Sequence, residues 1–218
     1  MKEVLVSPSI LGVNKNDLIE VTSSLLLSGA SLIHFDVMDG NFVTNKSFLE
    51  DEIDILSNFV KEDILDVHLM CFDLDKMIEK FSKKHVKYIS IHYEAKGEDE
   101  LISYSYLIKE KGIVPGIVIN PSTEVEKVYP LLKYFGLVLV MSVVPGKGGQ
   151  SFMPCSLEKI EKLVNFRKEN NLDFVIEVDG GINEKTSLLV KEKGVDILVA
   201  GSYILKSDNF KERIEKLR

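Results

Sequence analysis

Two histidines and two aspartates occupy positions from which they could bind one divalent metal ion. His34 and Asp36 lie two residues apart in an apolar segment, so in a β-strand both side chains project from the same face. His68 and Asp179 belong to two other segments of the same kind. A lone histidine of this type is usually a hydrogen-bonded core residue, but the set of four favours a metal site. Mixed nitrogen and oxygen ligands suit zinc, iron, manganese or cobalt, and the sequence does not choose among them; we expect one divalent ion per chain.

A second group of residues is rich in glycine and suits an anion. Pro145–Gln150 reads PGKGGQ, Asp179–Gly181 reads DGG, and Gly201–Ser202 reads GS. Glycine allows backbone N–H groups to approach an anion closely, and the N-terminus of a following helix adds a favourable dipole. One glycine pair alone would be an ordinary turn, but three such loops favour phosphate binding.

The elements that must position these groups alternate along the chain. Eight short apolar runs, which we expect to be strands, are Val4–Ser9, Leu32–Val37, Ile64–Met70, Tyr88–His92, Val114–Ile119, Leu137–Met141, Phe174–Val178 and Ile197–Ala200. Between them lie charged, amphipathic segments such as Asn16–Ser28, Leu74–Lys84 and Leu157–Asn170. Strands that alternate with helices of this length indicate parallel βαβ units. Eight units predict a single α/β domain over residues 1–218, a (β/α)8 TIM barrel; a doubly wound open sheet is the alternative.

A closed barrel requires successive residues of each strand to point alternately inward and outward. The polar residues of the predicted strands share one parity, and we expect an inward-facing set of Ser7, Ser9, His34, Asp36, His68, Asn120, Glu177 and Asp179. Met38, Met70 and Met141 have the same parity and would form an apolar collar around a metal. His92 also ends its strand facing inward, where it could touch a substrate. Enzymes of this fold keep their sites at the carboxyl ends of the strands.

Composition excludes several classes of partner. The chain has 218 residues, of which 27 are basic and 34 acidic, for a net charge of −7. This balance argues against nucleic-acid binding but not against a small anionic substrate. Cys71 and Cys155 have neither zinc-finger nor disulfide spacing. The longest apolar stretch, Gly136–Val144, is far shorter than the ~18 residues that span a bilayer. With no signal-peptide pattern at its start, we expect a cytoplasmic protein without a membrane partner.

Six motifs occur in order along nearly the whole chain: SPSIL, HFDVMDGNFV, DVHLM, PGKGGQSF, EVDGGI and AGS. In order and spacing they resemble the ribulose-phosphate 3-epimerase family. The resemblance implies a metal-dependent TIM-barrel isomerase of the pentose phosphate pathway that interconverts D-ribulose 5-phosphate and D-xylulose 5-phosphate. The reaction would be a two-base proton transfer at carbon 3 through an enediolate. The resemblance also implies a homo-oligomer, either a dimer or a hexamer.

The resemblance assigns roles to residues of this chain. It implies four metal ligands, His34, Asp36, His68 and Asp179. Two of them, Asp36 and Asp179, would also form the catalytic acid/base pair. The implied substrate-binding residues are Ser9, His68, Gly146, Lys147, Gly148, Gly149, Asp179, Gly180, Gly181, Gly201 and Ser202, with the glycines and Ser202 at the phosphate end.

The chain departs from the family pattern at three places. Lys147 stands where the family's loop usually has Phe, Val144 where it has Glu or Asn, and Thr44 where it has Pro. None of these is an implied metal ligand. The departures concern the loop that would cover the substrate.

Three alternatives to this activity differ in what they require of the sequence. Epimerisation of a six-carbon ketose phosphate, such as allulose 6-phosphate, would use the same chemistry. A non-enzymatic phosphosugar- or metal-binding protein on a decayed barrel would not need an acid/base pair, and the intact pair implied here, Asp36 and Asp179, argues against it. A barrel decarboxylase or synthase with a lysine-centred site would need an Asp-x-Lys-x-x-Asp pattern, and the nearest approach, Asp73–Lys76, is typical of the start of a helix.

Overall fold

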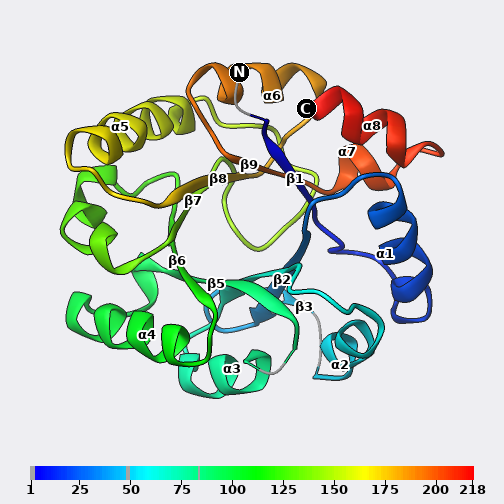
Figure 1. Cartoon of the computed structure of the whole chain (residues 1–218), viewed down its shortest axis with the longest axis horizontal. Coiled ribbons are helices and arrows are strands. Elements are labelled where there is room, and N and C mark those ends of the chain that lie inside the picture. The colour runs from blue at the N-terminus through cyan, green and yellow to red at the C-terminus, as the bar shows by residue number, and fades with distance from the viewer. Residues whose placement is uncertain (1–2, 48–49, 83) are drawn as a thin grey trace.

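The computed structural model describes residues 3–47, 50–82 and 84–218. Eight parallel strands form a ring with helices outside it (Figure 1). The strands are β1 (Leu5–Pro8), β2 (Ile33–Asp39), β4 (Leu65–Met70), β5 (Val86–His92), β6 (Val114–Ile119), β7 (Leu137–Met141), β8 (Val175–Asp179) and β9 (Ile197–Ala200). Each lies within two residues of a predicted strand at both ends.

The ring closes between β1 and β2, which decides between a barrel and an open sheet. β1 pairs in parallel with β9, and a further parallel bridge joins Ser9 to His34. The Ile10 N–H donates to the His34 carbonyl at 3.2 Å, and the Ser31 N–H donates to the Val6 carbonyl at 2.9 Å. The predicted TIM barrel is confirmed, and the open sheet is wrong.

Helices cover the outside of the ring in chain order (Figure 1). They are α1 (Leu18–Leu27), α2 (Glu50–Phe59), α3 (Leu74–Phe81), α4 (Glu98–Glu110), α5 (Cys155–Glu169), α6 (Glu184–Glu192), α7 (Ser202–Leu205) and α8 (Phe210–Leu217). The predicted helix Leu74–Lys84 ends early, at Phe81, and Lys83 lies outside the described residues. Between β6 and β7 the chain forms 3₁₀ turns, η3 (Val125–Tyr134), rather than an α-helix. Pro130 lies inside this segment, where it supplies no N–H and disfavours α-helical hydrogen bonding.

One element was not expected. After β2 the chain turns back and forms a two-residue strand, β3 (Lys46–Ser47), antiparallel to the end of β2. The Ser47 hydroxyl donates to the Asp36 carbonyl and accepts from the Met38 N–H at 3.1 Å. These contacts brace the carboxyl end of β2. A two-residue strand has too few positions to show an alternating pattern, so no pattern in the sequence indicated it.

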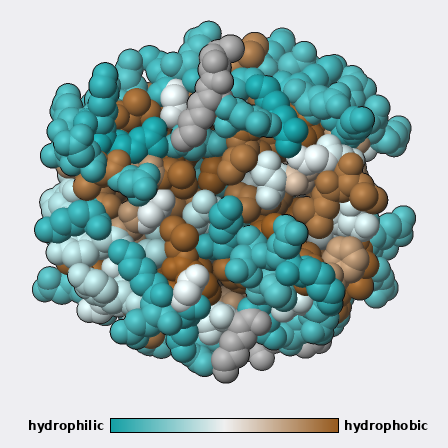
Figure 2. Space-filling view, viewed as in Figure 1, coloured by the Kyte–Doolittle hydropathy of each residue, from teal (hydrophilic) through white to brown (hydrophobic). Residues whose placement is uncertain are grey.

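Apolar side chains pack on both sides of the sheet. The larger core lies between the sheet and the helices and contains Phe35, Phe81 and Phe174, all almost fully buried. A smaller interior cluster consists of Leu32, Tyr88, Val118, Leu137, Leu139, Met141, Val143 and Ile197. Figure 2 shows hydrophilic side chains over the rim of helices and hydrophobic ones nearer the axis. The interior cluster shares the inside of the barrel with the polar inward-facing residues; Ile197, for example, is paired in register with Glu177. Within the described residues, every helix is too short or too polar to cross a membrane.

Candidate active site

Four polar side chains from three strands meet inside the carboxyl end of the barrel. His34 and Asp36 come from β2, His68 from β4 and Asp179 from β8, and one ligand atom of each lies within 4.8 Å of the others. Asp36 Oδ1 lies 3.4 Å from His34 Nε2 and 3.1 Å from His68 Nδ1. Both imidazoles are fully buried, and Asp36 is only 4% exposed. The convergence predicted from strand parity is therefore confirmed for all four residues.

The cluster fits a divalent cation. His34 Nδ1 lies 2.7 Å from Asp66 Oδ2, whereas His34 Nε2 is buried, faces the cluster and has no hydrogen-bond partner. A buried polar atom of this kind needs an explanation, and a ligand nitrogen held by a carboxylate on its other side is the common arrangement at metal sites. Burial lowers the pKa of His34, but the charges of Asp66 and Asp36 outweigh that effect and raise it well above its usual value. The surroundings of His34 thus stabilise positive charge.

A second set of buried groups lies behind His34. Asp66 of β4 accepts a hydrogen bond from the Ser7 hydroxyl at 3.0 Å as well as contacting His34. Glu177 of β8 is fully buried beside them, and neither of its carboxyl oxygens has a hydrogen-bond partner. Burial, followed by the charge of Asp66, raises the pKa of Glu177 well above its usual value. Asp66 was not among the predicted site residues; its spacing of two residues from His68, which puts both on one face of β4, was the available signal.

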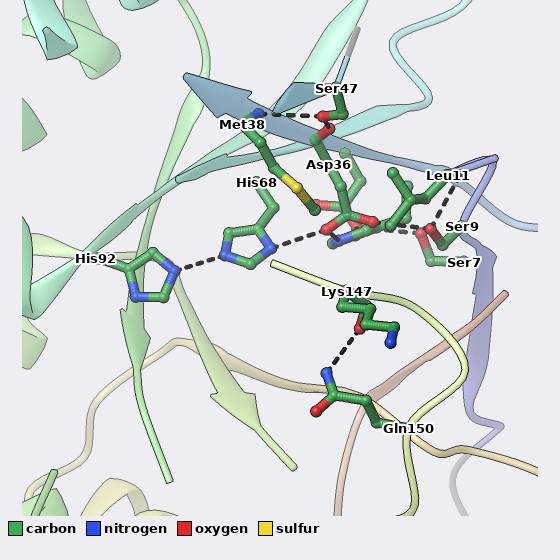
Figure 3. Close-up of polar contacts among 12 residues, drawn as sticks. Ser7, Ser9, Leu11, Asp36, Met38, Ser47, His68, His92, Lys147 and Gln150 are labelled. Carbon is green, nitrogen blue, oxygen red and sulfur yellow. Dashed lines mark hydrogen bonds and ion pairs between the residues drawn. The ribbon is translucent and has the colours of Figure 1, made fainter. Parts of the chain in front are cut away.

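The two aspartates of the cluster differ in environment. Asp36 Oδ2 accepts from the Ser9 hydroxyl at 2.8 Å (Figure 3). Burial raises the pKa of Asp36, but His34 and His68 outweigh that effect and hold it below its usual range. For Asp179, burial and then the charge of Asp36 raise the pKa to about 7. A pair of carboxyl groups with separated pKa values is suited to act as a base and an acid.

A cavity of about 770 Å³ lies above the cluster. Of the residues predicted to bind substrate, the lining includes Ser9, Gly146, Lys147, Gly148, Gly149, Asp179, Gly180, Gly181, Gly201 and Ser202. Asp36 also lines it, as do the three predicted collar residues Met38, Met70 and Met141. His68 and Asn120 do not line the cavity. The backbone N–H of Asn120 donates instead to Glu94 Oε1 at 3.0 Å. Contact between His68 and a substrate therefore stays a prediction.

Hydrogen bonds hold the loop after β7 in place. Gln150 donates through Nε2 to the carbonyls of Val144 and Lys147, each at 2.7 Å (Figure 3 shows the second contact). Asn45 donates to the Gly146 carbonyl at 2.7 Å and joins this loop to the one after β2. At Gly181, φ is +64°, and a Cβ would lie 2.7 Å from the Phe152 Cα. The loops around the cavity therefore pack closely against one another.

His92 lies behind His68, away from the cavity. Its Nε2 is 2.8 Å from His68 Nε2 (Figure 3), and its side chain is fully buried. It does not line the cavity. The idea that His92 reaches a substrate therefore finds no support in the geometry.

Known proteins are similar to this chain along nearly its whole length. The family model described as the ribulose-phosphate 3 epimerase family matches residues 5–205. The chain belongs to the ribulose-phosphate 3-epimerase family. Proteins named ribulose-phosphate 3-epimerase are 39% identical in a Synechocystis species and 34% identical in Escherichia coli. Each alignment covers 100% of this chain, together with 94% and 96% of those proteins, respectively.

Solved structures confirm the fold of this epimerase-family chain. A tryptophan synthase alpha-subunit from Pyrococcus furiosus superposes with a TM-score of 0.71 at 13% sequence identity, covering 98% of this chain and 96% of that one. A thiamine phosphate pyrophosphorylase from the same organism gives a TM-score of 0.63 at 15% identity, covering 99% and 93%. At these identities the likeness concerns the barrel alone.

Proposed function

We propose that this chain interconverts D-ribulose 5-phosphate and D-xylulose 5-phosphate by inverting the configuration at carbon 3. The observation that carries the proposal is the pair Asp36 and Asp179, which face one cavity beneath the glycine-rich loops. They come from β2 and β8, strands separated around the ring by β1 and β9. Two carboxyl groups approaching one carbon from different sides are what an inversion requires. The family membership supports the same reaction.

The two aspartates carry the proton transfer. The proton on carbon 3 is acidic because the neighbouring carbonyl takes up the charge as an enediolate. Asp36, which its neighbours keep ionised, is suited to remove a proton from one face of the substrate. Asp179, whose pKa is raised to about 7, can exchange a proton near neutral pH and deliver it to the other face. In the reverse reaction the roles exchange. Ser9 orients Asp36 through its hydroxyl.

We propose that His34, Asp36, His68 and Asp179 hold one divalent ion, with zinc favoured over iron, manganese or cobalt. The unpartnered His34 Nε2 and the two-imidazole, two-carboxylate donor set support the proposal. Such an ion would act as a Lewis acid toward the oxygens of the substrate. The methionines that line the cavity nearby would exclude water from the reacting carbon.

The glycine-rich loops are proposed to bind the phosphate. Gly148, Gly149, Gly181, Gly201 and Ser202 line the same cavity as the aspartates, and their backbone N–H groups are the proposed donors to the phosphate. Binding energy at the phosphate, remote from carbon 3, can hold the intermediate in place until it is reprotonated.

The decisive experiment is an epimerase assay on the metal-loaded chain, with D-ribulose 5-phosphate as the substrate and the product identified by NMR. We expect formation of D-xylulose 5-phosphate. No turnover with any ketose phosphate would favour the non-enzymatic binding protein. A higher kcat/KM for allulose 6-phosphate than for ribulose 5-phosphate would assign the enzyme to the six-carbon substrate.

We also propose that the chain forms a homo-oligomer, a dimer or hexamer, in the cytoplasm. The exposed apolar side chains on the helices support an interface, with Leu27 at 86% exposed and Leu188 at 55%. Cys71 and Cys155 are both free thiols, as in proteins of reducing compartments. Light scattering coupled to size-exclusion chromatography will give the number of chains in the assembly.

A further inference from the structure

A chain of polar contacts leads from the proposed metal cluster to the outer end of β5. His68 Nε2 is 2.8 Å from His92 Nε2, and His92 Nδ1 is 3.1 Å from Glu94 Oε2. Both imidazoles are completely buried, and the Glu94 side chain is 25% exposed. The Phe42 ring packs on His92 at a centroid distance of 4.6 Å. The contacts are therefore shielded from water, and each hydrogen of the series must lie on a defined atom.

Glu94 is fixed at the outer end of this series. Its other oxygen, Oε1, accepts from the Asn120 N–H at 3.0 Å and from the Thr123 hydroxyl. Asn120 and Thr123 belong to the loop after β6. Lys159 holds this loop in turn, because its buried ammonium group donates to the carbonyls of Asn120, Pro121 and Thr123. Burial raises the pKa of Glu94, but these donors and His92 outweigh it and lower the pKa to about 2. Glu94 is therefore an acceptor on both oxygens.

The hydrogen positions follow from this fixed end. An ionised carboxylate can only accept, so His92 must carry its hydrogen on Nδ1. A neutral imidazole has one N–H donor and one acceptor nitrogen, so with its hydrogen on Nδ1 the His92 ring accepts at Nε2, which lies 2.8 Å from His68 Nε2. His68 must then donate from Nε2, which leaves the lone pair of its Nδ1 free. That atom is the one that faces the cluster, 3.1 Å from Asp36 Oδ1.

We propose that Glu94 and His92 are positioning residues that set the tautomer of His68, so that its Nδ1 lone pair faces a divalent cation. The inference rests on the proposed metal site. His34 has a similar arrangement without an intervening imidazole. Asp66 contacts its Nδ1 directly, and its Nε2 faces the cluster. The two imidazole ligands thus present different ring nitrogens, each selected by a carboxylate on its far side.

The first test compares Glu94→Gln with Glu98→Gln in the full chain. A glutamine at 94 has an NH2 group that must face either His92 Nδ1 or the donors of Asn120 and Thr123, so it cannot satisfy both. Glu98 lies four residues further on, at the start of α4, and among the described residues its side chain accepts from the Tyr93 hydroxyl at 3.3 Å, so its variant is the matched control. We expect the Zn²⁺ dissociation constant, from competition with a chromogenic chelator, to rise about 10–100-fold in Glu94→Gln and to stay unchanged in Glu98→Gln. The Co²⁺ absorption spectrum should change in the first variant only.

The second test needs no substitution. In ¹⁵N NMR spectra of the zinc-loaded wild-type chain, His92 should be protonated at Nδ1 and His68 at Nε2. Protonation of His92 at Nε2 would overturn the inference, and so would unchanged Zn²⁺ affinity in a folded Glu94→Gln variant. Both results leave the metal site intact. A wild-type chain that binds no divalent ion would instead overturn the proposed metal site and this inference with it, so the two failures are distinguishable.

Discussion

Asp36 and Asp179 are chemically identical side chains that the barrel places in different surroundings. Asp36 contacts two imidazoles and a hydroxyl, whereas burial and the charge of Asp36 dominate at Asp179. The difference comes from His34, His68 and Ser9, of which only His34 is close to Asp36 in the sequence. The expected behaviour of each residue follows from these surroundings.

Proton transfer through two separate carboxyl groups has an isotopic consequence. In heavy water the product should carry deuterium at carbon 3, and little hydrogen should pass from substrate to product within one turnover. Substantial internal transfer would indicate a single base. Asp36→Asn and Asp179→Asn should each lower kcat by about 10²–10⁴-fold or more. Because both residues are proposed metal ligands, the metal content of each variant has to be measured alongside its rate.

Lys147 offers a test of the phosphate end. It is exposed and lines the cavity within the loop held by Gln150. An ammonium group at the rim can approach the substrate phosphate, and an exposed ion pair contributes roughly 0–1 kcal/mol. We expect Lys147→Ala to raise KM about two- to fivefold at low salt, with kcat unchanged and a smaller difference at high salt. Lys185→Ala, at a position outside the cavity, is the control; equal KM values in both variants and wild type would show that Lys147 has no role.

At the scale of elements, function depends on how closely the loops pack. Gly181 has positive φ, and an added Cβ would overlap the Phe152 backbone; Gly148 has no positive φ, and its Cβ would have its nearest neighbour at 3.7 Å. Gly181→Ala should therefore lower the free energy of unfolding by roughly 1–3 kcal/mol and raise KM about tenfold or more, whereas Gly148→Ala should change neither greatly. Thermal unfolding and steady-state kinetics measure the two effects. A stable Gly181→Ala enzyme with normal KM would contradict the close packing.

Much of the fold and site could be predicted because the strands carry two signals at once. In β2 and β4, apolar residues alternate with polar ones, so the same pattern identified the strand and the inward direction of His34, Asp36 and His68. β3 has no such pattern, and η3 was not predicted as a 3₁₀ segment. The role of Glu94 depends on Thr123 and Lys159, which are distant in sequence and come together only in the folded barrel.

At the scale of the molecule, metal binding and stability are linked. Treatment with a chelator should abolish turnover, and one divalent ion per chain should restore it. At an ion concentration about 1,000 times its dissociation constant, the folded state should gain about 4 kcal/mol. Metal analysis, activity and thermal unfolding on the same sample measure this. His68→Ala should weaken metal binding while leaving the fold largely intact. Full activity in metal-free protein would refute the metal requirement.

β1 lies between β2, which follows it closely in the sequence, and β9, the last strand of the chain. During synthesis on the ribosome, β1 can therefore pair with β2 early and with β9 only at the end. Three of the four proposed ligands lie within the first 70 residues, and Asp179 emerges more than 100 residues later. At about 5–20 residues per second, translation leaves an interval of roughly 5–20 s between His68 and Asp179, during which β1 has β2 beside it but lacks β9. During that interval the nascent chain can bring His34, Asp36 and His68 together, but Asp179 is still missing. The complete catalytic pair exists only after β8 and β9 have been synthesised.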